Sequence, residues 1–101
     1  MNKNKALSML GMATRAGKTV SGEFAVEKSV KQGTARLVLL AEDASDNTKK
    51  KFTDMCTYRK VPLLQFADRE TLGRAIGKEF RACVAIEDEN LAKVVSGHIC
   101  D

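Results

Sequence analysis

Basic side chains gathered near glycines are the residues of this sequence whose types and spacing best suit chemistry. The chemistry would be phosphate binding, because ammonium and guanidinium groups pair with anionic oxygens. Three clusters stand out: Arg15 with Lys18; Lys28, Lys31 and Arg36; and Arg74, Lys78 and Arg81. A fourth run, Lys49 to Lys51, is better explained as a solvated face, because consecutive helical side chains fan around the axis.

An aromatic residue between cations makes the segment from Gly77 to Ala82 the best candidate for contact with bases. Phe80 lies between Lys78 and Arg81. An exposed ring in this setting stacks on an unpaired base while the cations meet phosphates. The sequence is equally compatible with a Phe80 side chain that folds back onto the core.

Catalytic and metal-binding constellations are not expected. The one histidine, His98, falls on an amphipathic helix position, and Cys56 and Cys83 sit in apolar contexts typical of inert buried thiols. The acidic run from Glu87 to Glu89 is typical of a first helical turn, because consecutive side chains point apart. No GxGxxG segment is present, and Gly11, Gly17 and Gly22 do not have the spacing of a phosphate-binding loop. We therefore expect neither an enzyme nor a cofactor.

The composition indicates one folded domain over residues 1–101, with 44% hydrophobic and 30% charged residues. A net charge of +4 favours anionic partners such as nucleic acid. The three cysteines lack CxxC spacing, which fits a reducing compartment. No apolar run approaches the roughly 20 residues needed to span a bilayer, and the basic N-terminal segment predicts a helix rather than a signal peptide. We expect a cytoplasmic protein, monomeric by default.

The stretch from Ser21 to Asp43 predicts a helix, a glycine stop and a buried strand. Gly22 stands where the helix begins, behind a possible Ser21 cap. Gly33 ends the helix, since glycine adopts the left-handed conformation without a Cβ clash. Residues 37–41 run apolar without alternation, as in a strand covered on both faces. The free N–H groups and positive dipole end near Gly22 suit a phosphate-bearing partner.

Helices and short apolar strands alternate along the rest of the chain. Helices are predicted over residues 4–16, 48–59 and 69–76 and from about residue 87 onward, with strands at 18–21, 61–66 and 82–86. Asp68 is the expected cap of the helix over 69–76, and the last helix is expected to share one face among Leu91, Val94, Val95 and His98. This alternation indicates an α/β domain with helices on both faces of a mixed sheet.

Three segments of the chain resemble the kink-turn-binding ribosomal-protein superfamily, the L7Ae type, and in particular its small bacterial YlxQ-type members. They are GxxxxxK from Gly22 to Lys28, GTARLVLLAEDAS from Gly33 to Ser45, and LGRAIGKEFRACVAI from Leu72 to Ile86. The resemblance covers nearly the whole chain in the same order. It implies a three-layer α-β-α sandwich around a four-stranded mixed sheet.

The same resemblance implies a kink-turn RNA ligand, a bent duplex with tandem sheared G·A pairs. In the family, the N-terminus of the second helix enters the widened groove, and a later loop covers bases that flip out. By position, Gly22 matches the glycine at the helix start and Lys28 the lysine one to two turns later. Glu42 and Asp43 match the acidic end of the central strand, and residues 77–82 match the second RNA-facing loop.

The chain departs from the family pattern just after Gly22. Many members carry an asparagine and a glutamate that contact guanine edges, whereas Phe24 and Ala25 stand at these positions here. Neither side chain makes a polar contact to a base, although the adjacent Glu23 is a possible substitute. Recognition of shape and backbone by lysines and N–H groups survives this change.

The sequence therefore predicts a non-catalytic RNA-binding protein related to the ribosome or translation, which captures kink-turn or similarly bent RNA. The expected RNA-contacting residues are Lys18, Gly22, Glu23, Lys28, Lys31, Glu42, Asp43, Arg74, Lys78, Phe80 and Arg81. The alternative is a protein-interaction module on the same fold with only generic affinity for RNA. Protein partners in translation are compatible with both hypotheses.

Overall fold

Helices and strands alternate along the chain in the computed structural model, which describes residues 1–100. The helices are α1 (Lys3–Arg15), α2 (Glu23–Gln32), α3 (Asp46–Arg59), α4 (Arg69–Ala75) and α5 (Glu89–Cys100). The strands are β1 (Thr19–Ser21), β2 (Leu37–Leu40), β3 (Leu63–Gln65) and β4 (Cys83–Ile86). The alternation predicted from the sequence is confirmed.

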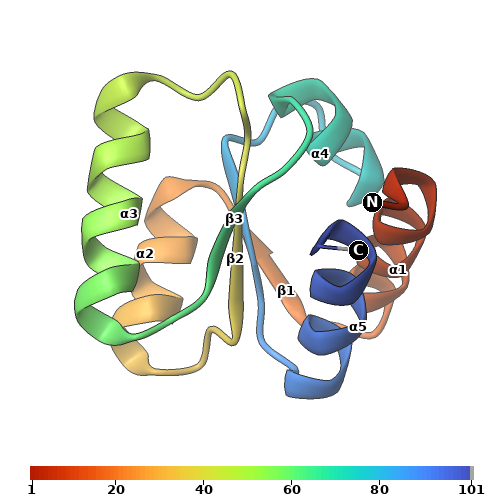
Figure 1. The fold of residues 1–101 in the computed structure, drawn as a ribbon, viewed down its shortest axis with the longest axis horizontal. Helices are drawn as coiled ribbons and strands as arrows, with labels where there is room; N and C mark the ends of the chain where they lie inside the picture. The colour runs from red at the N-terminus through yellow and green to blue at the C-terminus, as the bar shows by residue number, and fades with distance from the viewer. Residues whose placement is uncertain (101) are drawn as a thin grey trace.

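The strands form one mixed sheet in the order β1-β4-β2-β3. Strand β4 runs antiparallel to both β1 and β2, whereas β2 and β3 are parallel. Helices α2 and α3 cover one face of the sheet, and α1, α4 and α5 cover the other (Figure 1). The predicted three-layer sandwich is therefore confirmed. Every residue of the two central strands, β2 and β4, is buried, which explains their unbroken apolar sequences.

The sheet has two ends, the Gly22 end and the Gly33 end, each called after the glycine that lies there. At the Gly22 end, β1 and β2 finish and β4 begins; the Gly22 N–H donates to the Cys83 carbonyl at 3.1 Å, and the Ala41 N–H donates to the Ala82 carbonyl at 2.8 Å. At the opposite, Gly33 end, α2 finishes, β2 begins and β4 finishes. In Figure 1, α4 and the β2–α3 turn lie toward the top, and the α2–β2 turn lies at the bottom.

Capping side chains set the boundaries of α3 and α4. The Ser45 hydroxyl accepts from the Thr48 N–H at 3.2 Å, so α3 begins two residues before the predicted start. The Asp68 carboxylate accepts from the Thr71 N–H at 2.7 Å, which confirms the predicted cap. The strand expected over residues 61–66 is shorter, because only Leu63–Gln65 pairs with β2.

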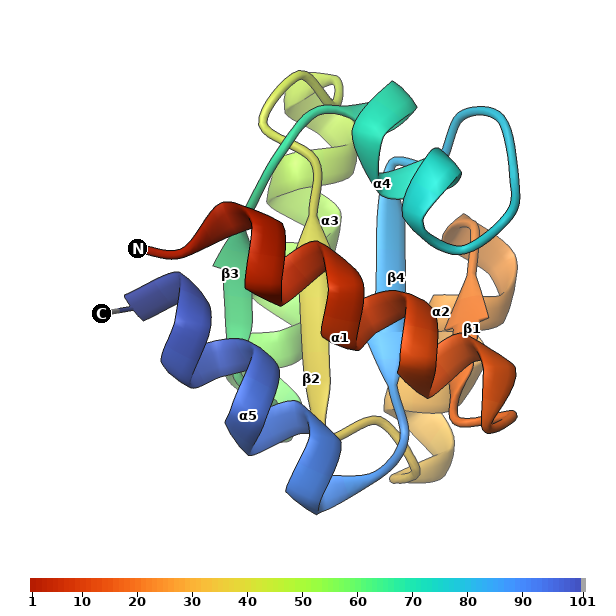
Figure 2. The same ribbon diagram turned by 90° about the vertical axis from the view of Figure 1, so that its right-hand side faces the viewer.

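The buried face of α5 differs from the predicted one. Ala92, Val95 and Ile99 are buried, whereas Val94 is exposed, so the predicted stripe is wrong by about one helical position. Helix α5 packs closely along α1, as Figure 2 shows, and the spacing of apolar residues alone does not say which side of α5 its neighbours cover. The Asn2 N–H donates to the His98 carbonyl at 2.6 Å and ties the two helices at their ends.

Candidate nucleic-acid interface

Gly22 is the residue that turns the chain from β1 into α2. Its backbone has φ 90° and ψ 156°, a conformation that is essentially restricted to glycine. No side chain caps α2, and Gly22 itself is the N-cap residue. In the described part of the chain, the amides of Glu23, Phe24 and Ala25 have no hydrogen-bond acceptor. These N–H groups point out of the start of α2, as expected for the first turn of a helix.

Ser21 does not cap α2, so this prediction is wrong. Ser21 is the last residue of β1, and its hydroxyl accepts from the Nε of Arg81 at 3.1 Å. The same guanidinium donates from Nη1 to the Phe80 carbonyl at 2.8 Å. Arg81 thereby joins the loop of residues 77–82 to the β1–α2 turn, and two of the segments predicted to contact RNA lie together.

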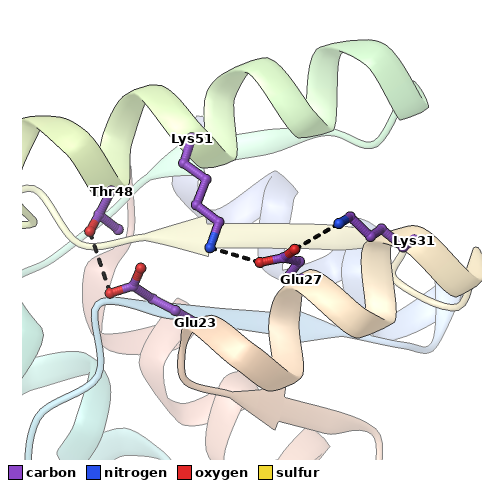
Figure 3. A network of polar contacts seen from close by, with 5 residues as sticks. All are labelled: Glu23, Glu27, Lys31, Thr48 and Lys51. Atoms are coloured by element: carbon purple, nitrogen blue, oxygen red, sulfur yellow. Dashed lines mark hydrogen bonds and ion pairs between the residues drawn. The ribbon is translucent and has the colours of Figure 1, made fainter.

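Glu23 leans toward α3 rather than away from the protein. Its Oε2 accepts from the Thr48 hydroxyl at 3.4 Å (Figure 3). The Thr48 hydroxyl oxygen in turn accepts from the Ser45 hydroxyl at 2.9 Å. A carboxylate held in this way is oriented by the start of α3. Contact between Glu23 and a base is compatible with this geometry, because Glu23 is exposed.

One turn further along α2, the Glu27 carboxylate binds two ammonium groups. Lys31 and Lys51 each lie 2.7 Å from one of its oxygens (Figure 3). The two hydrogen bonds lower the pKa of Glu27 to about 2, and the bond to Glu27 raises the pKa of Lys51. Of the two α2 lysines predicted to meet RNA, Lys31 is thus engaged by a carboxylate, while Lys28 forms no ion pair within residues 1–100.

The pKa of Glu27 predicts a specific dependence of stability on pH. The folded pKa of about 2 lies below the ordinary glutamate value of 4.5, so the stabilisation is complete above pH 4.5 and is lost as the pH falls toward 2. An NMR titration of the Glu27 side-chain carboxyl carbon should show a midpoint near pH 2 in the wild type. In Lys51→Met and Lys31→Met the midpoint should move upward, since each variant removes one ammonium group. A wild-type midpoint of 4.5 would contradict the bridged geometry.

The loop of residues 77–82 is held against α4 by its backbone. The Lys78 N–H donates to the Gly73 carbonyl at 2.7 Å, and the Arg81 N–H donates to the Arg69 carbonyl at 3.1 Å. A Cβ at Gly73 would lie 2.2 Å from the Glu79 carbonyl oxygen, so the loop approaches α4 more closely than any side chain allows. The loop is therefore positioned by main-chain contacts.

Phe80 extends outward from this loop. Its side chain is 59% exposed, so the alternative in which the ring folds back onto the core is wrong. Lys78 is also exposed, and Arg81 is half-buried by its contacts with Ser21 and the Phe80 carbonyl. The loop therefore presents an aromatic ring between two cations, in the arrangement that suits an unpaired base and its phosphates.

The acidic end of β2 lies at the Gly22 end as well. Asp43 accepts from the Arg69 N–H at 2.9 Å, and its second oxygen lies 3.4 Å from the Arg69 Nε. Asp43 therefore fixes the start of α4, whereas Glu42 is exposed and donates its N–H to the Ala67 carbonyl at 2.7 Å. This end of the sheet is consequently mixed in charge and is not a uniformly basic patch.

Two other predicted cations lie in different places. Arg74 is exposed on α4, and its carbonyl accepts from the Gly77 N–H at 3.2 Å, so it lies at the base of the 77–82 loop. Lys18 precedes β1, and its carbonyl accepts from the Glu87 N–H at 2.8 Å, where β4 has finished. Lys18 is therefore at the Gly33 end, and the structure does not bring it together with Gly22.

The sequence profile of the ribosomal protein L7Ae/L30e/S12e/Gadd45 family matches residues 4–96. The chain belongs to this family. Its relatives in the family include a Bacillus subtilis (strain 168) protein named RNA-binding protein YlxQ, which is 53% identical over 89 residues, or 87% of this chain and 89% of the relative. Large ribosomal subunit protein eL8 of Thermoplasma volcanium is 33% identical over 83% of this chain and 70% of its own length.

A solved structure described as a protein with unknown function from Bacillus halodurans C has the same fold. It superposes with a TM-score of 0.93 at 38% identity and covers 96% of this chain and 98% of its own. The names of the two family members above are those of RNA-binding and ribosomal proteins rather than of enzymes. This agrees with the expectation that the chain is not an enzyme.

Within this L7Ae-type family member, Phe24 is the feature that sequence reasoning valued too little. Its ring is 84% exposed and, with Lys28 one turn later, lines a shallow hollow of about 290 Å³ along α2. The sequence does indicate the exposure of Phe24, because it precedes the buried Val26 by two residues and therefore faces away from it on a helix. The contacts of Thr48 and Lys51 with Glu23 and Glu27 could not be predicted from sequence spacing, because they join α3 to α2.

The thiols of the L7Ae-type core are structural. Cys56 and Cys83 are buried, and desolvation raises their pKa values to about 11 and about 12, so both stay protonated at neutral pH. In residues 1–100, no group of three or more histidine, cysteine and acidic side chains is arranged to hold a metal. No helix in the same range is long and apolar enough to cross a bilayer.

Proposed function

We propose that the chain is a non-catalytic, cytoplasmic RNA-binding protein of translation, and that its Gly22 end captures a kink-turn or a similarly bent RNA. A protein that binds the bent conformer more tightly than the extended one shifts the RNA toward the bent state. The activity is therefore stabilisation of an RNA shape, and no chemical step is required.

The observation that carries this proposal is the convergence of the α2 start and the 77–82 loop. The sequence predicts that both segments face RNA, and the bond from Arg81 to Ser21 joins them directly. The free amides of the first turn of α2 and the positive dipole end suit phosphate or base-edge acceptors. The family membership and the names of the relatives give independent support.

Each part of this surface has a distinct role in the proposal. Lys28 and the α2 amides hold backbone phosphates, and Glu23 or the Gly22 backbone meets the guanine edges. Phe80 packs on an extruded base, with Lys78 and Arg81 on the flanking phosphates. Shape and backbone dominate recognition, because Phe24 and Ala25 carry no polar group for a base.

The direct test is a titration of the protein against two RNAs at physiological salt. One RNA is a kink-turn with intact sheared G·A pairs, and the other is the same duplex with these pairs converted to Watson–Crick pairs. Tight binding to the kink-turn alone is expected. Equal, weak and strongly salt-dependent binding to both RNAs would reduce the Gly22 end to a generic polyanion site.

Lys28→Ala should weaken kink-turn binding and lower the slope of log affinity against log salt by about one unit, the contribution of one phosphate contact. Lys28 forms no ion pair in the described residues, so its charge is available to RNA. Lys5→Ala is the matched control, because Lys5 is exposed on α1, across the sheet from α2. A slope that is the same in wild type and Lys28→Ala would remove Lys28 from the contacts.

Phe80→Ala should lower kink-turn affinity by about 1–3 kcal/mol through the loss of one stacked ring. Protein stability should change little, because the ring is 59% exposed and outside the core. Val94→Ala serves as the control, since it shortens an exposed apolar side chain on α5, which belongs to neither of the two RNA-facing segments. Equal affinities of Phe80→Ala and wild type would show that no base stacks on this ring.

The exposed Phe24 favours a second candidate function, a protein-interaction module. A ring that is 84% exposed, at a position where polar contacts to guanine are expected, offers an apolar anchor for a protein partner. If this function holds, Phe24→Ala abolishes capture of the partner and leaves RNA affinity unchanged. If the RNA function holds, the kink-turn titration separates the two RNAs whatever residue stands at position 24.

A further inference from the structure

A groove of about 870 Å³ opens at the Gly33 end of the sheet, at the opposite end from Gly22. It lies where the C-terminal ends of α2 and α3 meet the start of β2 and the first turns of α5. In Figure 1 these segments lie at the bottom of the molecule. No residue of the proposed kink-turn site lines this groove. Of the residues predicted from the sequence to contact RNA, Lys31 lines it, near the C-terminus of α2.

The groove is strongly cationic. Its lining includes the basic residues Lys31, Arg36, Arg59, Lys60 and Lys93 and a single acidic residue, Glu89. Within residues 1–100, four of these cations, all except Lys31, form no ion pair. Lys31 and Lys51 both bind the Glu27 carboxylate, so the three side chains together carry one net positive charge.

Helix dipoles do not account for so many cations. The C-termini of α2 and α3 each carry a partial charge of about −0.5, which together balance about one cation. The N-terminal end of α5, which also borders the groove, contributes a partial charge of the opposite sign. Several positive charges therefore remain without a protein counterpart, and an anionic ligand is the partner that complements them.

The floor of the groove and an adjacent ring suit an unpaired base. Val30, Leu37 and Ala92 form an apolar floor beneath the cationic rim. Beside the groove, Tyr58 is 82% exposed, and the Arg59 guanidinium lies 5.7 Å from the centre of its ring. Apolar or aromatic surface flanked by cations is the arrangement that binds single-stranded nucleic acid through stacking and phosphate contacts.

We propose that this groove is a second RNA site, which binds the phosphate backbone and an unpaired base of a single-stranded segment. The rim cations Arg36, Lys60 and Lys93 hold phosphates, while the floor and Tyr58 accept a base. The two sites lie at opposite ends of the sheet, so one protein can join a bent RNA to a neighbouring single strand. The proposal uses the charge and shape of the Gly33 end and stands independently of the kink-turn site.

Substitution of Lys60 separates a loss of charge from a loss of stability. It is the C-cap residue of α3 and has φ 60° and ψ 40°, a left-handed conformation that glycine adopts more readily. Lys60→Gly removes one rim charge and relieves the backbone strain, so we expect an unchanged or higher melting temperature. A loss of RNA affinity in this variant then has no origin in misfolding.

The experiment measures the fluorescence anisotropy of labelled decauridylate across a salt series. Lys60→Gly should weaken binding about threefold to tenfold and lower the salt slope by about 0.7, the value for one single-strand phosphate contact. Arg36→Gln with Lys93→Gln should lower the slope by about 1.4, the value for two such contacts. The matched control is Lys3→Gln with Lys5→Gln, which removes the same charge from α1 and should leave affinity within twofold. If the control variant loses as much affinity as the groove variants, or the groove variants lose none, the proposal is overturned.

Two further readouts identify the ligand and separate this site from the kink-turn site. A blunt RNA duplex should compete with decauridylate at least fivefold more weakly than unlabelled decauridylate does, and equal competition would refute recognition of an unpaired base. Decauridylate should shift the NMR amide signals of Arg36 and Lys60 more than that of Phe24, and the reverse pattern would refute the location. Arg36→Gln with Lys93→Gln should still bind the kink-turn more tightly than the same duplex with Watson–Crick pairs, as the wild type should. The groove proposal and the kink-turn proposal are therefore tested separately.

Discussion

Gly22→Ala should lower the free energy of unfolding by about 1–3 kcal/mol and weaken kink-turn binding about tenfold, the equivalent of ~1.4 kcal/mol. The cause is conformational, because a Cβ at Gly22 would meet no atom within 4 Å, yet φ 90° and ψ 156° are essentially closed to other residues. To relax, the chain must rotate the start of α2, and the three free amides would then point elsewhere. Chemical denaturation and the kink-turn titration measure the two effects.

Gly33→Ala is the matched control for this prediction. Gly33 also has positive φ, but at φ 80° and ψ 16° it lies in the left-handed helical region that other residues enter at a cost of about 1–2 kcal/mol. It ends α2 at the far end from the proposed site. Gly33→Ala should therefore lose stability and keep kink-turn affinity. Equal affinities in Gly22→Ala and wild type would show that the orientation of the α2 amides does not matter for binding.

Much of the fold follows from rules that act over a few residues. The apolar runs of β2 and β4 predict strands covered on both faces, and burial of every residue in both strands confirms this. The stops at Gly33 and Gly77 are confirmed by their positive φ values of 80° and 76°. The predicted face of α5 is wrong because helical periodicity gives the relative positions of side chains but not which side of the helix the neighbouring elements cover.

The candidate site was less accessible to sequence reasoning, because its geometry depends on residues far apart in the chain. The bond between Arg81 and Ser21 spans 60 positions, and no local pattern contains it. The charges of Lys28 and Lys31 are equivalent in the sequence, whereas in the structure Glu27 binds Lys31 and not Lys28. Lys18 was predicted to contact RNA together with Gly22, yet β1 separates them and places Lys18 at the other end of the sheet.

Gly73, the first glycine of LGRAIG, is a residue whose importance the sequence indicates but whose physical role only the structure explains. The resemblance included Gly73 as part of a motif, without a physical reason for a glycine at this helical position. The structure supplies the reason: the Glu79 carbonyl carbon would lie 2.6 Å from a Cβ at Gly73, and the Phe80 nitrogen would lie 3.0 Å from it. Gly73 therefore sets the distance between α4 and the loop that carries Phe80.

Gly73→Ala should consequently lower the free energy of unfolding by about 3 kcal/mol, the upper part of the range for overpacking. The Glu79 oxygen would lie 2.2 Å from the added carbon, and it belongs to the backbone, so no side-chain rotation relieves the contact. The bond from the Lys78 N–H to the Gly73 carbonyl at 2.7 Å resists separation of the two segments. Denaturant unfolding followed by circular dichroism measures the change.

Gly97→Ala is the helical control, because a Cβ there would meet no atom within 4 Å. It should raise stability by about 0.5–1 kcal/mol, since alanine loses less conformational entropy than glycine in a helix. A Gly73→Ala protein as stable as wild type would show that the loop moves freely from α4.

Measuring stability and kink-turn affinity together tests whether RNA binding depends on the position of the loop. Gly73→Ala should lower both quantities, whereas Phe80→Ala should lower affinity alone. Loss of stability with full kink-turn affinity in Gly73→Ala would mean that RNA binding does not depend on the loop's position, and the role assigned to Phe80 would fall with it.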